Sequence, residues 1–292
     1  MTDQHSHDHA EHDELEDHDL GLSHDVPQLV AQQRRAWGRR GLLGLLGGVG
    51  AVALVGCGDD DQTTLTGSDT SASASTESHV DVADGEIPEE TAGPYPGDGS
   101  NGANVLSESG IVRSDITSSF GTASAVAEGV PVTVKLKVYD LNGTDISALG
   151  GAAVYLWHCD REGSYSMYSE SVADENYLRG VQETAADGSV HFTTIFPACY
   201  SGRWPHMHFE VYESLASATS YENKLRTSQL AIPEAACQEV YGVVDGYDAS
   251  VSNLEQVSLD SDNVFSDGYS LQLATVTGSV AEGYTLSLNV PV

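Results

Sequence analysis

The chain has 292 residues and a formal net charge of −32, with 12 lysine and arginine residues against 44 aspartate and glutamate residues. This balance excludes partners that are bound through a basic surface, such as nucleic acids. Four cysteines are too few for a disulfide-held miniprotein, so the folded part needs a hydrophobic core.

The first 25 residues form an acidic block with six histidines, which are His5, His7, His9, His12, His18 and His24. Histidine-rich tracts can bind metal ions. A block that is acidic and poor in apolar residues is also typical of a disordered tail. We interpret the block as such a tail and expect any metal role there to be separate from a catalytic site.

The next block carries the pattern of an export signal. Two arginine pairs, at 34–35 and 39–40, precede an uncharged run of Leu, Gly, Val and Ala at 41–56 that ends at Cys57. A basic patch, a short apolar run and a small residue before a cleavage point are typical of a signal peptide. A membrane-spanning anchor is the alternative, but the run is shorter than the ~20 apolar residues that a span needs.

Two short motifs in this block indicate the export route. The sequence Arg-Arg-Gly-Leu-Leu at 39–43 resembles a twin-arginine signal. The sequence Leu-Val-Gly-Cys at 54–57 resembles a bacterial lipobox, in which Cys57 becomes the lipidated first residue. We therefore expect residues 1–56 to be the tail and a twin-arginine lipoprotein signal peptide. The mature protein is expected to face outward as a membrane lipoprotein or to be secreted.

The rest of the chain divides into a tether and one domain. Residues 57–85 begin at the lipidated cysteine and are mainly Asp, Thr, Ser, Ala and Gly, which predicts a flexible tether. The folded domain is expected over 86–292, with folded sequence beginning near Ile87. That length suits a single β-domain.

Within the domain the apolar period is two. Between Val132 and Val138 every second residue is apolar, which predicts a half-buried strand. Five more segments follow the same pattern: Ala153–Trp157, Val190–Ile195, His206–Val211, Leu271–Val276 and Tyr284–Val290. Turn dipeptides separate several of these segments, and a helical period is visible only near 215–225. The sequence therefore predicts an all-β fold, a β-sandwich with long loops.

Two histidines form the first part of a predicted metal site. His206 and His208 lie two residues apart in an expected strand, and side chains at i and i+2 point to the same face. Two imidazoles on one strand face can bind a metal ion together. Alone, a His-x-His pair is a weak signal.

Two tyrosines strengthen this prediction. Tyr200 lies six residues before His206, on the loop that enters the strand, and Tyr165 follows the strand that ends at Trp157. Phenolate is a hard oxygen donor, and a trivalent ion can displace a proton with a pKa near ~10. Two phenolates would cancel two of the three charges of Fe(III), which favours ferric over ferrous iron. Such a site differs from the two-His, one-carboxylate ferrous centres.

This pattern resembles the intradiol ring-cleavage dioxygenases, the family of catechol and protocatechuate 3,4-dioxygenases, and in particular its secreted, single-chain actinobacterial members. The family's first tyrosine ligand follows a tryptophan at the spacing seen here between Trp157 and Tyr165. Its second tyrosine ends a Thr-Ile-x-Pro-x-x-Tyr segment, which matches residues 194–200. Its histidine pair matches His206 and His208.

Further matches assign the rest of the expected site. The family's arginine three residues before the first histidine matches Arg203, and a glutamine on the following strand matches Gln229. Residues 91–95 match an N-terminal Thr-x-Gly-Pro-Tyr piece that lines the substrate pocket in relatives, which assigns Thr91, Pro94 and Tyr95 to the pocket. The likeness covers roughly residues 87–230, and the Trp-Pro pair at 204–205 is a departure from it.

The resemblance implies a function. The chain would open catechol-type rings with O2 to cis,cis-muconate-type products, at a non-haem Fe(III) ion bound by Tyr165, Tyr200, His206 and His208. Tyr200 would leave the metal when a catechol binds and take a substrate proton. Arg203 and Gln229 would stabilise negative charge that develops on the ring. The partners would be a small aromatic diol, O2 and, through the lipid anchor at Cys57, a membrane; the oligomeric state stays open.

The assignment of the metal ligands leaves alternatives at several residues. Tyr168 and Tyr177 lie close enough in sequence to Tyr165 to compete for its role, and Tyr168 is the alternative ligand. His158 and His191 are interpreted as strand or pocket-wall residues.

For the cysteines, the expected export favours a disulfide among Cys159, Cys199 and Cys237, without an assigned pairing.

Two other functions compete with the enzyme. A β-sandwich can be a non-catalytic cell-surface module, and the same residues could serve a metal-binding lipoprotein that takes up copper or zinc. Colour separates these functions, because phenolate-bound Fe(III) absorbs visible light and zinc does not. The sequence does not specify the substrate, although the scarcity of Lys and Arg favours neutral over carboxylated catechols.

Overall fold

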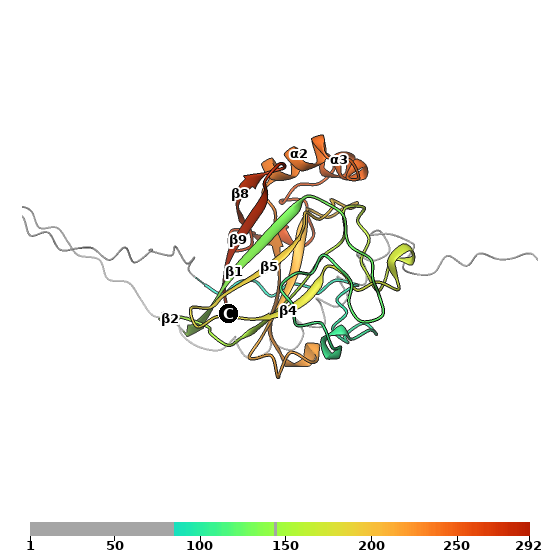
Figure 1. Cartoon of the computed structure of the whole chain (residues 1–292). Coiled ribbons are helices and arrows are strands. Elements are labelled where there is room, and N and C mark those ends of the chain that lie inside the picture. Colours follow the sequence, from blue (N-terminus) through green and yellow to red (C-terminus); the bar gives the residue numbers. More distant parts are fainter. Residues whose placement is uncertain (1–84, 143–144) are drawn as a thin grey trace, which may run out of the picture.

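The computed structural model describes residues 85–142 and 145–292 (Figure 1). The predicted tail, signal peptide and lipidation at Cys57 lie outside the described residues, as does the predicted tether except for its last residue. Within the described part of the chain, no helix is long and apolar enough to cross a membrane.

The described residues form nine strands in two sheets. The first sheet has the order β2-β1-β9-β8, with β5 also paired to β1, and the second has the order β4-β3-β6-β7. The strands are β1 (Pro131–Asn142), β2 (Asp145–Ala148), β3 (Ala153–Trp157), β4 (Arg179–Glu183), β5 (Ser189–Ile195), β6 (His206–Tyr212), β7 (Lys224–Ala231), β8 (Thr275–Ser279) and β9 (Gly283–Pro291). This arrangement confirms the predicted all-β fold.

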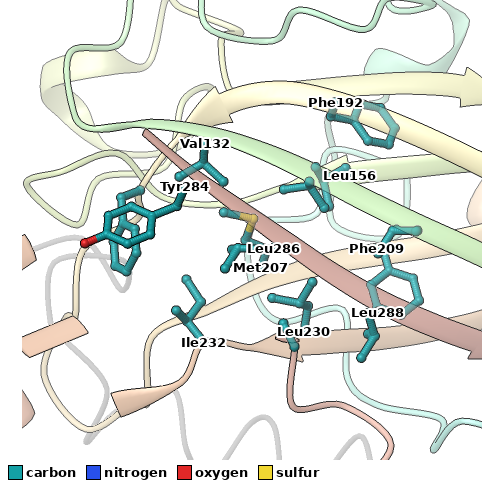
Figure 2. Close-up of a cluster of buried hydrophobic side chains, with 14 of the residues drawn as sticks. Val132, Leu156, Phe192, Met207, Phe209, Leu230, Ile232, Tyr284, Leu286 and Leu288 are labelled. Atoms are coloured by element: carbon teal, nitrogen blue, oxygen red, sulfur yellow. The ribbon is translucent and has the colours of Figure 1, made fainter. Parts of the chain in front are cut away.

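The core lies between the two sheets because strands of both place alternate apolar side chains there. In β1 the inward residues are at most 2% exposed, and they are Val132, Val134, Leu136 and Val138. Figure 2 shows side chains of the second sheet, such as Met207 and Phe209, beside Leu286 and Leu288 of β9. Each such side chain contributes about 1.5–3 kcal/mol through burial.

Strand β6 is buried along its whole length. Met207, Phe209 and Val211 belong to the core between the sheets. His206 and His208 therefore point to the outer face of the second sheet, as the two-residue period predicts.

The two α-helices lie in segments where no helix was predicted. The stretch near 215–225 contains only the short 3-10 helix η4 (Tyr221–Asn223) and the start of β7, whereas α2 (Glu234–Val243) and α3 (Asp248–Leu254) follow β7. Figure 1 shows both helices together at one end of the sandwich. Helices this short depend on tertiary packing and leave little periodicity in the sequence. Three further 3-10 helices are η2 (Val105–Ser107), η3 (Glu170–Val172) and η5 (Phe265–Asp267).

One predicted strand is displaced. The segment predicted at Leu271–Val276 becomes a strand only from Thr275, because the residues before it turn towards the other sheet. There, Leu273 forms an isolated bridge with Ala231 at the end of β7.

The expected disulfide is wrong, because Cys159, Cys199 and Cys237 are buried free thiols. Cys199 and Cys237 pack in the core between the sheets, as small apolar side chains do. Burial raises the pKa of Cys199 to about 12, which keeps it a neutral thiol. Hydrophobic packing therefore holds the domain together without a crosslink in its described part.

Two C-terminal tyrosines fix the segment that leads to Tyr200. The hydroxyl of Tyr247 donates to the carbonyl of Phe196 at 2.7 Å and accepts from the backbone N–H of Val130 at 3.2 Å. The hydroxyl of Tyr241 donates to the carbonyl of Pro197 at 2.9 Å. The C-terminal helical region thus holds the end of β5 in place.

We expect Tyr247→Phe to destabilise the domain by about 1–3 kcal/mol, because it leaves a buried carbonyl and a buried N–H without this partner. The measurement is the free energy of unfolding in urea. Tyr221→Phe is the matched control, since Tyr221 is 36% exposed, and it should change stability by less than about 0.5 kcal/mol. Equal effects of the two substitutions would contradict the prediction.

A buried carboxyl group lies farther along β6, on the same face as the histidines. Glu210 accepts from the hydroxyl of Tyr212 at 2.6 Å and from that of Thr227 at 3.3 Å, and Lys224 Nζ lies 3.8 Å from it. Burial, followed by the nearby charge of Asp98, raises the pKa of Glu210 to about 8, although Lys224 acts against this shift. Glu210 is therefore largely protonated at neutral pH.

This raised pKa predicts a pH-dependent stability. The stabilisation that the protonated Glu210 carboxyl gives the folded state is fully present below pH 4.5, the pKa of this group in the unfolded chain. It is lost as the pH rises towards 8. Glu210→Gln cannot ionise, so its stability relative to wild type should rise over this range by on the order of 3 kcal/mol. Urea unfolding at several pH values measures the difference. The exposed Glu213→Gln serves as the control, and a pH-independent difference for Glu210→Gln would refute the prediction.

Candidate metal centre

The four predicted metal ligands lie together on the outer face of the second sheet. His206 Nε2 lies 3.2 Å from His208 Nε2 and 3.2 Å from the hydroxyl of Tyr200. The ring of Tyr165 lies 6.0 Å from that of Tyr200 and 6.3 Å from that of His208. Two imidazole nitrogens and two phenolic rings therefore form one cluster, and we call these four residues the ligand cluster.

Pairing in the sheet and stacking orient the histidines. His208 faces Trp157 of β3 and Gln229 of β7, and its ring stacks on the indole of Trp157 at 5.0 Å and 8°. His206 Nδ1 lies 2.5 Å from the carbonyl of Trp204, to which it donates. That bond leaves Nε2 as the unprotonated nitrogen that faces the cluster.

Two loops bring the tyrosines to the histidines. The loop that carries Tyr165 is closed by Asp160, which accepts from the N–H groups of Glu162 and Ser164 at 3.0 and 2.8 Å. In the same loop Gly163 has φ +92°, and a Cβ there would lie 3.2 Å from Cβ of Tyr200. Glycine thus permits the two ligand loops to approach each other.

Helix α3 holds the second of these loops. The side chain of Asn253 donates to the carbonyl of Cys199 at 2.8 Å, and the N–H of Cys199 donates to the hydroxyl of Ser250 at 3.0 Å. Tyr200 follows directly and is only partly buried, whereas Tyr165 is 3% exposed. The two tyrosines therefore differ in their freedom to move.

Burial sets the charge of the cluster. It raises the pKa of Tyr165 well above its usual value and that of Tyr200 to about 12. It also lowers the pKa values of His206 and His208 well below their usual range, with help from the charge of Arg203. Without a cation, the cluster consists of neutral phenols and neutral imidazoles.

The donor set fits a hard trivalent cation. Among the described residues the Tyr165 hydroxyl is buried without a hydrogen bond of normal geometry, although the Tyr200 hydroxyl lies nearby. A phenol that would otherwise lack a partner and two neutral imidazoles whose Nε2 atoms lie 3.2 Å apart are suited to a metal ion. In the described part of the chain, His, Cys, Asp and Glu form no group of three with metal-binding geometry. A metal site here therefore requires the phenolic oxygens.

The competing tyrosines have other partners. The hydroxyl of Tyr168 accepts from the N–H of Gly97 at 2.8 Å, and that of Tyr177 donates to Asp160 at 3.0 Å. Of the three tyrosines considered for this role, Tyr165 is the one that the fold brings to the histidines.

The other two histidines of the described residues are not part of the cluster. His158 is buried between the carbonyl of Cys159, at 2.7 Å, and the hydroxyl of Thr194, at 2.6 Å. His191 lies on β5 at a surface depression of about 590 Å³ on the first sheet, which contains none of the predicted site residues.

Arg203 and Gln229 lie beside the cluster. Arg203 Nη1 is 3.4 Å from His206 Nε2, and Nη2 donates to Gln229 Oε1 at 2.7 Å. The third contact was not predicted: Arg203 Nε donates to Asp262 Oδ2 at 2.9 Å, and Asp262 is fully buried. No motif marks Asp262 in the sequence, because 58 residues separate it from its partner Trp204.

The N-terminal pocket segment, residues 91–95, also reaches the cluster. The carbonyl of Thr91 accepts from Gln229 Nε2 at 2.9 Å, and the ring of Tyr95 lies 5.1 Å from that of Tyr165. A Cβ at Gly93 would lie 3.4 Å from Cε1 of His208, which shows how closely the backbone passes over the imidazole. Pro94 lies between these contacts, and its carbonyl accepts from the side chain of Asn101.

Arg179 anchors this segment. Its guanidinium donates to the carbonyls of Pro96 and Tyr95 at 2.8 and 2.9 Å, and to the carbonyl of Ser166 at 2.9 Å. Because Arg179 begins β4, one buried side chain fixes both the pocket segment and the Tyr165 loop to the second sheet.

Comparisons with known proteins find similar sequences for part of the chain. A family model described as Dioxygenase matches residues 113–220. Over 63 residues the chain is 40% identical to the chlorocatechol 1,2-dioxygenase of Rhodococcus opacus. This match covers 22% of this chain and 23% of that protein. Over 61 residues it is 36% identical to catechol 1,2-dioxygenase 1 of Acinetobacter lwoffii, which covers 20% of each chain. The chain thus matches less than a quarter of the length of these curated relatives.

The same fold is found in a solved structure. The intradiol ring-cleavage dioxygenase of Tetranychus urticae superposes with a TM-score of 0.56 at 23% identity, over 71% of this chain and 94% of that one. The matched sequence segment contains all four residues of the ligand cluster and Arg203. Residues 113–220 thus match the Dioxygenase family model, and the chain has the fold of an intradiol ring-cleavage dioxygenase.

Proposed function

We propose that the chain is an intradiol dioxygenase that opens catechol-type rings with O2 to cis,cis-muconate-type products. Its metal would be a non-haem Fe(III) ion held by Tyr165, Tyr200, His206 and His208. The observation that carries the proposal is the convergence of two neutral imidazole Nε2 atoms and two phenolic hydroxyls in a buried cluster. Bound ferric iron would supply the acidity that ionises both tyrosines and the catechol hydroxyls.

The two tyrosines are suited to different roles. Tyr165 is deeply buried and packed between Tyr95 and Tyr200, which makes it a fixed ligand. Tyr200 is partly exposed, and its pKa of about 12 makes its free phenolate a strong base. Tyr200 Oη is therefore the atom that would take a proton from a catechol hydroxyl.

Arg203 provides positive charge beside the reacting ring. Its Nη1 lies near the histidine pair, and the guanidinium is buried, where its charge acts strongly on nearby groups. Gln229 has both ends of its amide engaged, with Arg203 and with Thr91. We therefore assign Gln229 mainly to orientation and Arg203 to stabilisation of charge that develops on the ring.

The substrate class follows from the few cations near the cluster. Of the lysine and arginine side chains in the described part of the chain, Arg203 alone has a hydrogen-bonding contact with one of the four ligands. The other buried arginine there, Arg179, is occupied by backbone carbonyls. We infer that neutral catechols are preferred over carboxylated ones, which would bury a carboxylate without a partner.

The location of the enzyme is proposed from sequence alone. The twin-arginine and lipobox-like motifs at 39–57 support export and a lipid anchor at Cys57. A non-catalytic or metal-binding surface lipoprotein remains the competing function, and turnover of catechol separates it from the enzyme.

The ligand assignment predicts a coloured wild-type protein and a loss of colour or activity when a ligand tyrosine is replaced. The purified protein should contain about one iron per chain and absorb visible light, with a band that shifts when catechol binds under anaerobic conditions. Tyr165→Phe should lose this band and most of the iron. Tyr200→Phe should keep part of the band and lose at least about 100-fold in kcat, because its general base is gone. Tyr168→Phe is the matched control and should retain both; a colourless wild-type protein after ferric loading would refute the function.

The substrate inference predicts a ratio of rates. We expect kcat/KM for catechol to exceed that for a catechol carrying a ring carboxylate by at least about 10-fold, the effect of roughly 1.4 kcal/mol of unpaired charge. Oxygen uptake with both substrates measures it. A higher kcat/KM for the carboxylated ring would show that another cation reaches the pocket.

A further inference from the structure

The guanidinium of Arg203 is held by a carboxylate from the C-terminal part of the chain. Asp262 follows α3 and lies outside the matched segment 113–220. Its side chain is fully buried, and that of Arg203 is 3% exposed. The N–O distance of 2.9 Å makes this a desolvated ion pair.

The two oxygens of Asp262 have separate partners. Oδ2 accepts from Arg203 Nε at 2.9 Å and from the N–H of Trp204 at 2.7 Å. Oδ1 accepts from the N–H groups of Val264 and Phe265 at 2.8 and 3.2 Å. Oδ1 therefore shapes the turn that leads into η5, whereas Oδ2 is directed at the active-site segment.

The bond to Nε determines where the rest of the guanidinium points. The group is planar, so fixing its Nε edge and its Nη2 leaves Nη1 with one direction. Nη2 donates to Gln229 Oε1 at 2.7 Å, and Nη1 then lies 3.4 Å from His206 Nε2. Asp262 thus sets the position of the positive charge relative to the ligand cluster.

The arrangement continues beyond Arg203. Gln229 Nε2 donates to the carbonyl of Thr91 at 2.9 Å. A continuous chain of hydrogen bonds therefore links Asp262, Arg203, Gln229 and the pocket segment, with Arg203 as donor to both Asp262 and Gln229. It joins a C-terminal loop to the N-terminal residues across the site.

A second carboxyl group near Arg203 does not take this role. Burial and the charge of Asp267 raise the pKa of Glu90 to about 8, so Glu90 is largely neutral at pH 7. Its carboxyl group accepts from Gln272 Nε2 at 3.4 Å. The direct contact and the charge that balances Arg203 both belong to Asp262.

We propose that Asp262 is a positioning residue for the ring-opening reaction, which acts by holding Arg203 with Nη1 directed at the substrate side of the ligand cluster. The proposal rests on the function proposed above and deepens it. The side-chain hydrogen bonds of Asp262 go to Arg203, Trp204, Val264 and Phe265, none of which is one of the four proposed ligands. Its effect on the reaction is transmitted through Arg203.

The substitution Asp262→Asn distinguishes the roles of the two carboxylate oxygens, because it keeps an acceptor at one position and places a donor at the other. The amide oxygen can still accept from Val264 and Phe265 at the Oδ1 position, so the turn is retained. The amide NH2 group then faces Arg203 Nε and the N–H of Trp204, where donor meets donor. The exposed Asp260→Asn is the matched control, two residues away in the same loop.

The first measurement does not require activity. In protein labelled with 15N-arginine, the Nε–H signal of Arg203, assigned by its loss in Arg203→Lys, should exchange slowly with solvent. Asp262→Asn should speed that exchange at least about 10-fold, because the acceptor is gone, and Asp260→Asn should leave it unchanged. An unchanged exchange rate in Asp262→Asn would overturn the proposal.

The second measurement is kinetic. Asp262→Asn should lower kcat for catechol by about 10- to 100-fold and change KM by less than about 3-fold, because a misdirected charge matters most in the transition state. Iron content should stay within about 20% of wild type. In a double-mutant cycle, Asp262→Asn should lower kcat by less than about 2-fold when Arg203 has already been replaced by Gln.

The outcomes separate the two proposals. Additive losses in the cycle, or a loss of kcat that follows loss of iron, would show that Asp262 is merely structural. A wild-type protein that binds iron but does not turn over catechol would refute the proposed function. In that case the exchange measurement still decides whether Asp262 holds Arg203.

Discussion

The site depends on one constraint, the burial of strand β6 on both faces. Its core face contributes Met207 and Phe209 to the packing between the sheets, and its outer face carries His206 and His208. The histidines cannot change position without disturbing the core, because the strand register sets both faces together. A rigid pair of imidazoles results directly from the packing that stabilises the fold.

Burial of the outer face also sets the chemistry. The Tyr165 and Tyr200 loops and the pocket segment at 91–95 cover the histidines, and desolvation keeps all four donors neutral. Because the four ligand groups are neutral, no electrostatic repulsion between them opposes their close approach. Binding of a cation would ionise the phenols, so the energy of metal binding would be coupled to proton release.

The sequence predicted what local pattern determines. The alternation at 132–138 and at 206–211 gave the strands and the shared face of the histidines, and the spacing of Tyr165 and Tyr200 placed both on loops beside that face. What it missed depends on contacts between distant segments. The short helices α2 and α3 are stabilised by packing, the expected disulfide is replaced by buried thiols, and Asp262 meets Arg203 only in the folded chain.

The position of the site residues relative to the segment matched by the family model has a functional meaning. The segment matched by the family model contains the four ligands and Arg203, whereas Thr91, Gln229 and Asp262 lie on either side of it in the sequence. These outer residues orient Arg203 and the pocket segment and are not among the four proposed ligands. Under the proposed function, changes in the N- and C-terminal segments would therefore alter how a ring is held and leave the ligand cluster the same. Differences in substrate preference between relatives of this fold are expected to arise in these segments, because the ligand cluster itself is constrained by the core.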